Sequence, residues 1–207
     1  MVPERSGIVF VIAAPSGTGK STITECLLHE LLALEFSVSY TTRAPRPGER
    51  NGEHYHFVER PAFEVMRHRG AFLESAEVHG QLYGTQLAAT QAALARGADL
   101  LLDIDVEGAR QVRQAPVDSV SIMILPPDFH ALEERLAVRG SEGGAERALR
   151  LSRARDEATS YLEFDYLVVN QRLDATLGEV VAIVRAERRR ARRCDAEARR
   201  ILASFPA

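Results

Sequence analysis

The sequence predicts an α/β fold in which a parallel β-sheet is flanked by helices. Residues 8–13 form a continuous apolar run rich in β-branched side chains, as is typical of strands buried on both faces of a sheet. A glycine-rich turn follows at residues 14–19, and apolar residues then recur at helical spacing from Ile23 to Leu32. Strand-like and helix-like segments continue to alternate along the chain, which favours parallel strands joined by right-handed crossovers.

Short apolar runs bounded by turn residues predict the remaining strands. They cover residues 37–42, 54–58, 71–78, 100–105, 120–125 and 166–170. One helix is expected to begin near Pro61 and stop at Gly70, and another to span residues 86–96 and stop at Gly97. The helices expected toward the C-terminus are one after Pro126 and Pro127 with Asp128 as its cap, one over residues 146–161, and one from residue 174 to about 201.

Two stretches interrupt this alternation. Residues 37–83 are rich in strands and polar side chains, which predicts an inserted subdomain. Residues 139–146 (RGSEGGAE) are rich in glycine and lie between two arginine-bearing helices, a composition that suits a mobile lid. We therefore expect a single domain over residues 1–207, divided into a core (1–36, 84–134 and 156–207), the inserted subdomain (37–83) and a lid (135–155).

Composition and charge exclude several classes of protein. The 207 residues suit one domain, and 45% hydrophobic and 27% charged residues are ordinary for a globular protein. No apolar run reaches about 18 residues, so no membrane span is expected. The short polar N-terminus does not resemble a signal peptide, and two distant cysteines predict no disulfide framework, so we expect a cytoplasmic protein. The net charge of -3 gives no reason to expect nucleic-acid binding.

The turn at residues 14–21 (APSGTGKS) fits the pattern of a phosphate-binding loop, except that Ala14 stands where the pattern has its first glycine. Gly17 and Gly19 allow backbone N–H groups to approach phosphate oxygens, and the next helix directs its positive end at the same anion. Lys20 supplies a charge for the β and γ phosphates, and Ser21 a hydroxyl for Mg²⁺. The expected segment for binding a nucleoside triphosphate is Ala14, Pro15, Ser16, Gly17, Thr18, Gly19, Lys20, Ser21 and Thr22.

Five ordered motifs make the sequence resemble the guanylate kinase family over nearly its whole length. They are residues 37–57 (SVSYTTRAPRPGERNGEHYHF), 72–85 (FLESAEVHGQLYGT), 102–110 (LDIDVEGAR), 124–127 (ILPP) and 164–170 (FDYLVVN). The resemblance implies a P-loop NTPase core with a parallel five-stranded sheet flanked by helices, an inserted mixed-β GMP-binding subdomain and a small lid. It also implies an ATP:GMP phosphotransferase that uses Mg²⁺ bound with ATP.

Arginines and tyrosines of the inserted subdomain suit a phosphate group. Arg43 and Arg46 lie beside two prolines, which stiffen the loop, and arginine forks bind phosphate oxygens in pairs. Standing alone, two such arginines would favour a solvated basic loop. The resemblance assigns them, together with Tyr55 and Tyr83, to the phosphate of GMP. Glu49 lies in the same loop, and we expect it to support the arginines or the nucleotide through water.

A carboxylate is the expected reader of the base. Guanine presents its N1–H and 2-amino groups side by side, so one carboxylate can accept both hydrogen bonds, whereas adenine has no donor at either place. The resemblance makes this carboxylate Glu74, with Ser39, Thr85 and Asp105 completing the guanine contacts. The sequence departs from the family at Ser75, where Trp is usual, and at Leu82, where an aromatic residue is usual. We expect both changes to thin the wall around the base.

Further charged residues are expected beside the phosphates. Asp103 and Asp105 end the strand predicted at residues 100–105, so both should point to one face at the carboxyl edge of the sheet. Asp103 is the better candidate for the water shell of Mg²⁺, with Ser21, and Asp105 for the acceptor side. The resemblance assigns Arg139 and Arg150 to the ATP phosphates when the lid closes, and Arg135 and Asn170 to the vicinity of adenine. Because phosphoryl transfer depends on positioning and on placement of cations, the expected catalytic residues are Lys20, Arg43, Arg139 and Arg150.

Two other functions stay open at this stage. A non-catalytic protein-binding domain of the same fold would not need the intact phosphate loop. A kinase of the same fold acting on another phosphorylated acceptor, such as a sugar bisphosphate, would not need Ser39, Glu74 and Thr85.

Two remaining features are expected to carry no separate function. His54 and His56 alternate on a strand without a cluster of cysteines or carboxylates, so no metal site is expected there. The arginine-rich C-terminal helix is expected to be a solvated face rather than a nucleic-acid patch, because Glu187, Asp195 and Glu197 are interspersed. The expected partners are therefore the small molecules ATP and GMP, with no nucleic acid and no membrane, and the sequence leaves monomer or homo-oligomer undecided.

Overall fold

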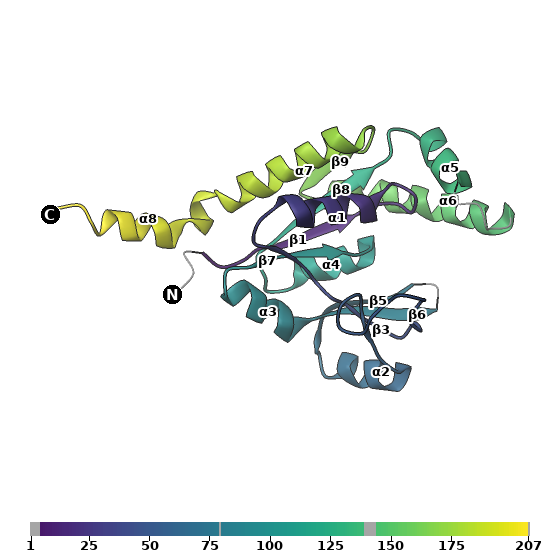
Figure 1. The fold of residues 1–207 in the computed structure, drawn as a ribbon, viewed down its shortest axis with the longest axis horizontal. Helices are drawn as coiled ribbons and strands as arrows, with labels where there is room; N and C mark the ends of the chain where they lie inside the picture. Colours follow the sequence, from purple (N-terminus) through teal and green to yellow (C-terminus); the bar gives the residue numbers. More distant parts are fainter. Residues whose placement is uncertain (1–4, 79, 139–143, 207) are drawn as a thin grey trace.

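The computed structural model describes residues 5–78, 80–138 and 144–206 (Figure 1). Its centre is a five-stranded sheet in the order β2-β7-β1-β8-β9, in which every neighbouring pair is parallel. Val9 lies beside Leu100 and Ser119, so the three central strands run in register to one carboxyl edge. The strands are β1 (Val9–Ala13), β2 (Leu34–Phe36), β7 (Asp99–Asp103), β8 (Ser119–Leu125) and β9 (Tyr166–Val169).

Helices cover both faces of this sheet. Phe10 and Ile12 of β1 pack with residues of α1 and α7, whereas Val9 and Val11 pack with residues of α3 and α4. Successive residues of β1 therefore point into different cores, which explains why the apolar run is uninterrupted. The four helices are α1 (Lys20–Glu30), α3 (Leu87–Ala95), α4 (Val106–Gln114) and α7 (Leu173–Arg188).

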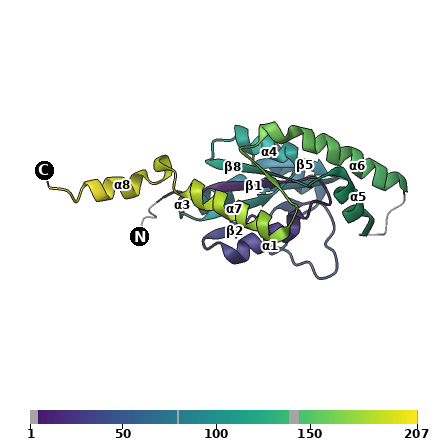
Figure 2. The same cartoon turned by 90° about the horizontal axis from the view of Figure 1, so that it is seen from above.

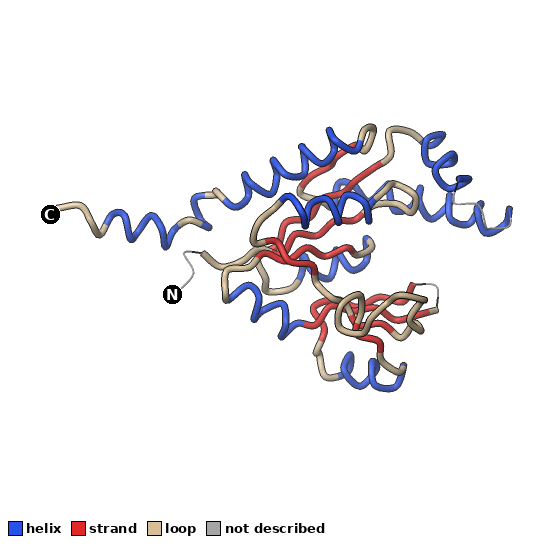
Figure 3. Tube along the Cα trace, in the orientation of Figure 1, coloured by secondary structure: helices blue, strands red, loops and turns tan. Residues whose placement is uncertain are grey.

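A second, mixed sheet of four strands has the order β4-β3-β6-β5. The pair β3–β4 is parallel, and β3–β6 and β5–β6 are antiparallel. Figure 3 shows its strands as a group apart from the large sheet. Its strands, and the helix that accompanies β5, are β3 (Tyr40–Thr41), β4 (His56–Phe57), β5 (Phe72–Val78), β6 (Gln81–Gln86) and α2 (Arg60–His68).

Two helices, α5 (Phe129–Val138) and α6 (Gly144–Thr159), extend beyond the carboxyl edge of the large sheet (Figures 1 and 2). As expected, Asp128 caps α5, because its Oδ1 accepts the N–H of Ala131 at 2.7 Å. A 3₁₀ turn, Ser160–Glu163, follows α6. Within the described ranges, no helix is both long enough and apolar enough to pass through a bilayer.

The predicted fold class is confirmed, but several elements differ from expectation. The strand expected over residues 37–42 is shortened to β3, and the sequence analysis does not anticipate β2, β6 or α4. Helix α4 begins after Asp105, whose Oδ1 accepts the N–H of Gly108 at 2.8 Å, and buries Ala109 and Val112. A capping residue followed by apolar residues at helical spacing could therefore have predicted α4. The polar residues between the apolar positions obscured this pattern.

The single helix expected from residue 174 to about 201 is wrong. Helix α7 ends at Arg188, a 3₁₀ turn follows at Ala191–Arg193, and α8 (Asp195–Leu202) extends away from the body of the molecule (Figure 2). The turn brings Arg193 back to Glu187, with which its guanidinium pairs. Residues six apart in a continuous helix lie on different faces, so this pair requires the break.

The C-terminal arginines are therefore not all a solvated face. Arg193 and Glu187 are buried, and Arg193 also binds Asp118 through two hydrogen bonds of 2.6 and 2.8 Å. Arg188 donates from Nε to the buried carboxylate of Asp99 at 2.7 Å. These pairs join the C-terminal segment to the amino edge of the large sheet.

Candidate active site

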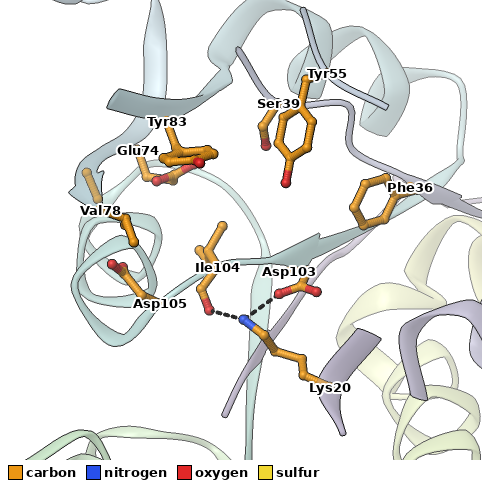
Figure 4. Close-up of a pocket in the computed structure, with 11 residues that line it drawn as sticks. Lys20, Phe36, Ser39, Tyr55, Glu74, Val78, Tyr83, Asp103, Ile104 and Asp105 are labelled. Atoms are coloured by element: carbon orange, nitrogen blue, oxygen red, sulfur yellow. Dashed lines mark hydrogen bonds and ion pairs between the residues drawn. The ribbon is translucent and has the colours of Figure 1, made fainter. Parts of the chain in front are cut away.

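A cavity of about 280 Å³ lies where the carboxyl edge of the large sheet faces the second sheet (Figure 4). In open α/β sheets this edge is the usual place for a ligand. Both parts of the molecule contribute side chains to it. The predicted site residues that line it are Lys20, Ser39, Tyr55, Glu74, Tyr83, Asp103 and Asp105.

The phosphate loop joins β1 to α1 and requires glycine at two positions. Gly17 and Gly19 have φ values of 89° and 96°, in the left-handed region that other residues avoid. A Cβ at Gly17 would come within 2.9 Å of Leu136, and one at Gly19 within 3.0 Å of Asn170. Ala14 is not among the residues with positive φ, so alanine fits where the common pattern has glycine.

Lys20 is the first residue of α1, and its ammonium group points into the cavity (Figure 4). It pairs with the carboxylate of Asp103 at the end of β7 and donates to the carbonyl oxygen of Ile104 at 3.1 Å. Both charged groups are partly exposed. The ammonium group is therefore accessible to an anion that enters the cavity.

Asp105 does not share a strand face with Asp103, contrary to prediction. Strand β7 ends at Asp103, and Asp105 is the N-cap of α4. The chain turns from strand to helix between the two residues, so the alternation of side chains along a strand no longer applies. Asp105 nevertheless lines the same cavity.

Glu74, in β5, carries a carboxyl group that is only 4% exposed. Burial raises the pKa of Glu74 to about 7; the charge of Asp105 adds to the rise, and Thr85 opposes it. Thr85 lies opposite Glu74 in β6, and its buried hydroxyl has no hydrogen-bond partner of good geometry among the described residues. A buried acid beside a buried, unsatisfied hydroxyl is an arrangement that a polar ligand would complete.

Arg43 is held by Glu49 through two hydrogen bonds of 2.9 and 2.8 Å. This pairing lowers the pKa of Glu49 to about 2 and raises the pKa of Arg43 above its ordinary value. The guanidinium carbon of Arg43 lies 5.3 Å from the ring centre of Tyr55, which meets Tyr83 edge to face. Burial raises the pKa of Tyr55. Arg46 donates its backbone N–H to Glu49, but its side chain is exposed and does not line the cavity.

A second cavity, of about 540 Å³, adjoins the phosphate loop. Arg135 of α5 donates to the carbonyl oxygens of Thr18 and Asn170 at 3.3 and 3.0 Å, and the Asn170 amide donates to that of Thr18 at 2.7 Å. These bonds join α5 and the end of β9 to the loop. The lining combines predicted residues (Gly17, Thr18, Gly19, Thr22, Arg135 and Asn170) with residues that the sequence analysis does not single out (Glu134, Gln171 and Leu173).

The family model described as guanylate kinase matches residues 6–187 of this chain. The chain belongs to the guanylate kinase family. The guanylate kinase of Rhodospirillum rubrum is 49% identical over 195 residues, which cover 93% of this chain and 89% of the relative. The guanylate kinase of Chromohalobacter salexigens is 44% identical over 203 residues, which cover 98% and 94%. The resemblance inferred from the motifs is confirmed.

A solved guanylate kinase structure also matches the fold. The crystal structure of guanylate kinase from Anaplasma phagocytophilum has a TM-score of 0.74 and 32% sequence identity, and covers 93% of this chain and 91% of its own. The parallel five-stranded sheet and the separate mixed sheet are therefore the architecture of the guanylate kinase family.

The two departures from the guanylate kinase family do not thin the wall of the cavity. Alternate residues of β5, Glu74, Ala76 and Val78, line it. Ser75 therefore points to the opposite face of the strand. Leu82 is fully buried and does not line the cavity either.

Among the arginines expected in the lid of this guanylate kinase, Arg139 lies outside the described residues, and Arg150 lies on α6. The same helix carries Glu157, whose pKa is raised by burial, while the charge of Lys20 opposes the rise. The sequence analysis does not single out Glu157. Glu157 lies seven residues after Arg150, so both are expected on the same side of the helix, and this spacing could have drawn attention to it in the sequence.

Proposed function

We propose that the chain catalyses reversible transfer of the γ-phosphoryl group of ATP to GMP, giving ADP and GDP, and that it also accepts dGMP. Membership of the guanylate kinase family supports the reaction. One observation supports the acceptor: the buried carboxyl group of Glu74 and the ammonium group of Lys20 border a single cavity. This supports an acceptor whose base lies at Glu74 and whose phosphate lies toward Lys20, where the phosphates of ATP are expected.

Glu74 recognises guanine when its own carboxyl group is ionised. Its carboxylate accepts the N1–H and 2-amino groups, and Thr85, Ser39 and Asp105 complete the contacts with the base. Adenine offers no donor at these positions and would leave a buried charge without partners. None of these contacts requires the 2′-hydroxyl group, so dGMP fits the same site.

Arginine and tyrosine side chains bind the phosphate of GMP. Glu49 holds the Arg43 fork in place before the nucleotide arrives, and Arg46, Tyr55 and Tyr83 add further donors. An oxygen of this phosphate is the nucleophile. Because it is already an anion, the reaction needs no general base.

The phosphate loop binds ATP, with the backbone of residues 14–19 and the side chains of Lys20, Ser21 and Thr22 around its phosphates. Arg135 and Asn170 lie beside adenine. Arg139 and Arg150 approach the phosphates when the lid closes and stabilise the negative charge that spreads over the transferred group. Closure also excludes water, which would otherwise accept the phosphoryl group.

Mg²⁺ suits the residues beside the phosphate loop. Asp103 supplies a carboxylate and Ser21 a hydroxyl, and the described part of the chain contains no group of three or more His, Cys, Asp or Glu residues arranged for a metal. Mg²⁺ keeps several waters and takes further oxygens from a triphosphate, so it needs few ligands from the protein. When bound with ATP, the ion would neutralise charge on the phosphates.

We also place the enzyme in the cytoplasm, with ATP and GMP as its partners. Its cysteines, Cys26 and Cys194, are free thiols, as suits a reducing compartment. The pairing of Arg188 and Arg193 with buried carboxylates argues against a nucleic-acid surface.

The test compares acceptors in a coupled assay of ADP release. GMP and dGMP should support turnover, and AMP, UMP and CMP should not. Glu74→Gln should lower kcat/KM for GMP by about 2–4 kcal/mol, roughly 30- to 1000-fold, because a charged hydrogen bond is lost in a desolvated site. AMP should gain relative to GMP, and the KM for ATP should barely change. Full GMP activity in this variant, or equal loss of ATP and GMP binding, would remove Glu74 as the reader of the base.

A further inference from the structure

Helix α4 contacts the outer edge of β5, the strand that carries Glu74. Strand β5 lies at the edge of its sheet and pairs with β6 on one side only. The outer edge of such a strand carries backbone N–H and C=O groups that need other partners. At Ser75, both groups are bound by one side chain of α4.

Gln111 is this side chain. Its Oε1 accepts the backbone N–H of Ser75 at 2.9 Å, and its Nε2 donates to the carbonyl oxygen of Ser75 at 3.0 Å. A primary amide has the donor and acceptor of a peptide unit, so Gln111 takes the place of a residue in a neighbouring strand. The N–H of Ser75 belongs to the peptide that directly follows Glu74. The clamp therefore fixes the backbone at the residue that carries the buried carboxylate.

The same face of α4 also leaves room for that carboxylate. Gly108 lies three residues before Gln111, about one helical turn away. A Cβ at Gly108 would be only 2.9 Å from Oε2 of Glu74. Meanwhile Ala109 and Val112 anchor α4 in the core against the large sheet. Helix α4 thus fixes the position of Glu74 relative to the sheet that positions the phosphate loop.

We propose that Gln111 is a positioning residue for guanine recognition, which holds the Glu74–Ser75 peptide against α4 so that the carboxylate faces the base. The inference rests on the proposed function and deepens it. Gln111 does not line the cavity, so it acts through Glu74 and not by touching the nucleotide. Without the clamp, only the pairing with β6 holds the peptide and the direction of the carboxylate is less closely fixed, whereas the ATP site is unaffected.

The test replaces Gln111 with Met, which has similar length and no amide. Gln114→Met is the matched control, because Gln114 is exposed at the last turn of the same helix. The measurements are thermal stability, the dissociation constant for GMP by calorimetry, and KM for each substrate. Gln111→Met should weaken GMP binding and raise the KM for GMP about tenfold, as expected for loss of two neutral hydrogen bonds. The KM for ATP and kcat at saturating GMP should stay within about twofold, as should every constant of the control.

A double-mutant cycle separates positioning from general stabilisation. In the Glu74→Gln background, Gln111→Met should raise the KM for GMP less than about twofold, because the group that it positions is already altered. If Gln111→Met does not fold, Gln111→Glu keeps an acceptor for the Ser75 N–H and takes its place in both backgrounds.

Three results would overturn the inference: an unchanged KM for GMP, equal rises for ATP and GMP, or the full effect in the Glu74→Gln background. A wild-type chain that fails to phosphorylate GMP would overturn the proposed function instead, and this inference with it.

Discussion

The two edges of the large sheet both carry cations paired with acids, but the acids lie in different surroundings. On the cavity side, Lys20 pairs with Asp103 at the sheet edge and Arg43 pairs with Glu49 in the loop after β3 of the second sheet, and these acidic side chains remain 20% and 16% exposed. The ammonium group of Lys20 can move to an incoming phosphate while water or a metal ion binds Asp103, whereas Glu49 keeps the Arg43 fork in place. Both cations are thus accessible to a ligand.

At the amino edge, the acids Asp99 and Glu187 are sealed from solvent, whereas Asp118, which also pairs with Arg193, is 41% exposed. Asp99 is fully buried and binds Arg188, Arg5 and the backbone N–H of Ile8. Glu187 is 2% exposed and pairs with Arg193. Moving Arg188 or Arg193 would leave a buried carboxylate with fewer partners in a site that water does not reach, which is costly. The comparison teaches that the presence of at least one buried acid, more than the number of arginines, separates a structural group of ion pairs from a binding site.

Removing a cation on the cavity side should give the largest effect on turnover. Lys20→Ala should lower kcat by at least about 10³-fold, or 4 kcal/mol, because the ammonium stabilises charge that develops on the phosphoryl group. The melting temperature should stay nearly unchanged, since the pair with Asp103 is partly exposed. Steady-state kinetics test the expected loss of kcat, and a thermal melt tests the expected stability. Near-normal turnover would exclude Lys20 from the chemistry.

The reverse pattern is expected at the amino edge. Arg193→Met should lower the free energy of unfolding by about 3 kcal/mol, while kcat/KM of the folded enzyme stays unchanged. The buried Glu187 loses its buried cation and keeps only Tyr166 and the exposed Arg190, and Asp118 loses two hydrogen bonds. Arg192→Met is the control, since that neighbouring side chain is 65% exposed and should change stability by less than about 0.5 kcal/mol. Chemical denaturation measures both. Equal stabilities for the two variants would remove the distinction between the edges.

A conservative change sharpens the comparison. Arg43→Lys keeps the charge but loses the planar fork that Glu49 holds, so kcat/KM for GMP should fall about 30-fold, or 2 kcal/mol. The KM for ATP and the melting temperature should change little. A variant with unchanged GMP kinetics would show that charge alone suffices at this position.

The smallest expected effect is on pH dependence. The pKa of Glu74 is raised from 4.5 to about 7 in the folded chain, and guanine needs the ionised form. The KM for GMP should therefore rise by up to about tenfold for each unit of pH below 7. The same shift gives Glu74 a stabilising contribution that is present at acidic pH and is lost as the pH rises through 7.

Glu74→Gln provides the control for this profile. The phosphate of GMP titrates with both enzymes, so the difference between their profiles isolates the carboxyl group of Glu74. Identical pH profiles for the two enzymes would contradict the assignment.

Sequence patterns predicted those features that are formed by residues close together in the chain. The strand, loop and helix around Lys20 follow from apolar runs and glycines, and five ordered motifs, of which residues 37–57 are the longest, indicated the family. Contacts between distant segments were not predictable in this way. The clamp from Gln111 to Ser75 and the pair of Arg193 with Asp118 join residues 36 and 75 positions apart, and neither leaves a periodic pattern. Asp105 was misplaced for a related reason, since a strand that ends in Asp-Ile-Asp resembles one that continues.

The break between α7 and α8 also marks where the folded body of the chain ends. The family model ends at residue 187, yet a chain cut there would lose Arg188 and Arg193 and leave Asp99 and Asp118 short of partners. Beyond Arg193, none of the described residues is buried, and α8 points away from the body of the molecule in both views (Figures 1 and 2). A surface tether or a fused reporter attached after Leu202 would therefore leave both cavities open to solvent.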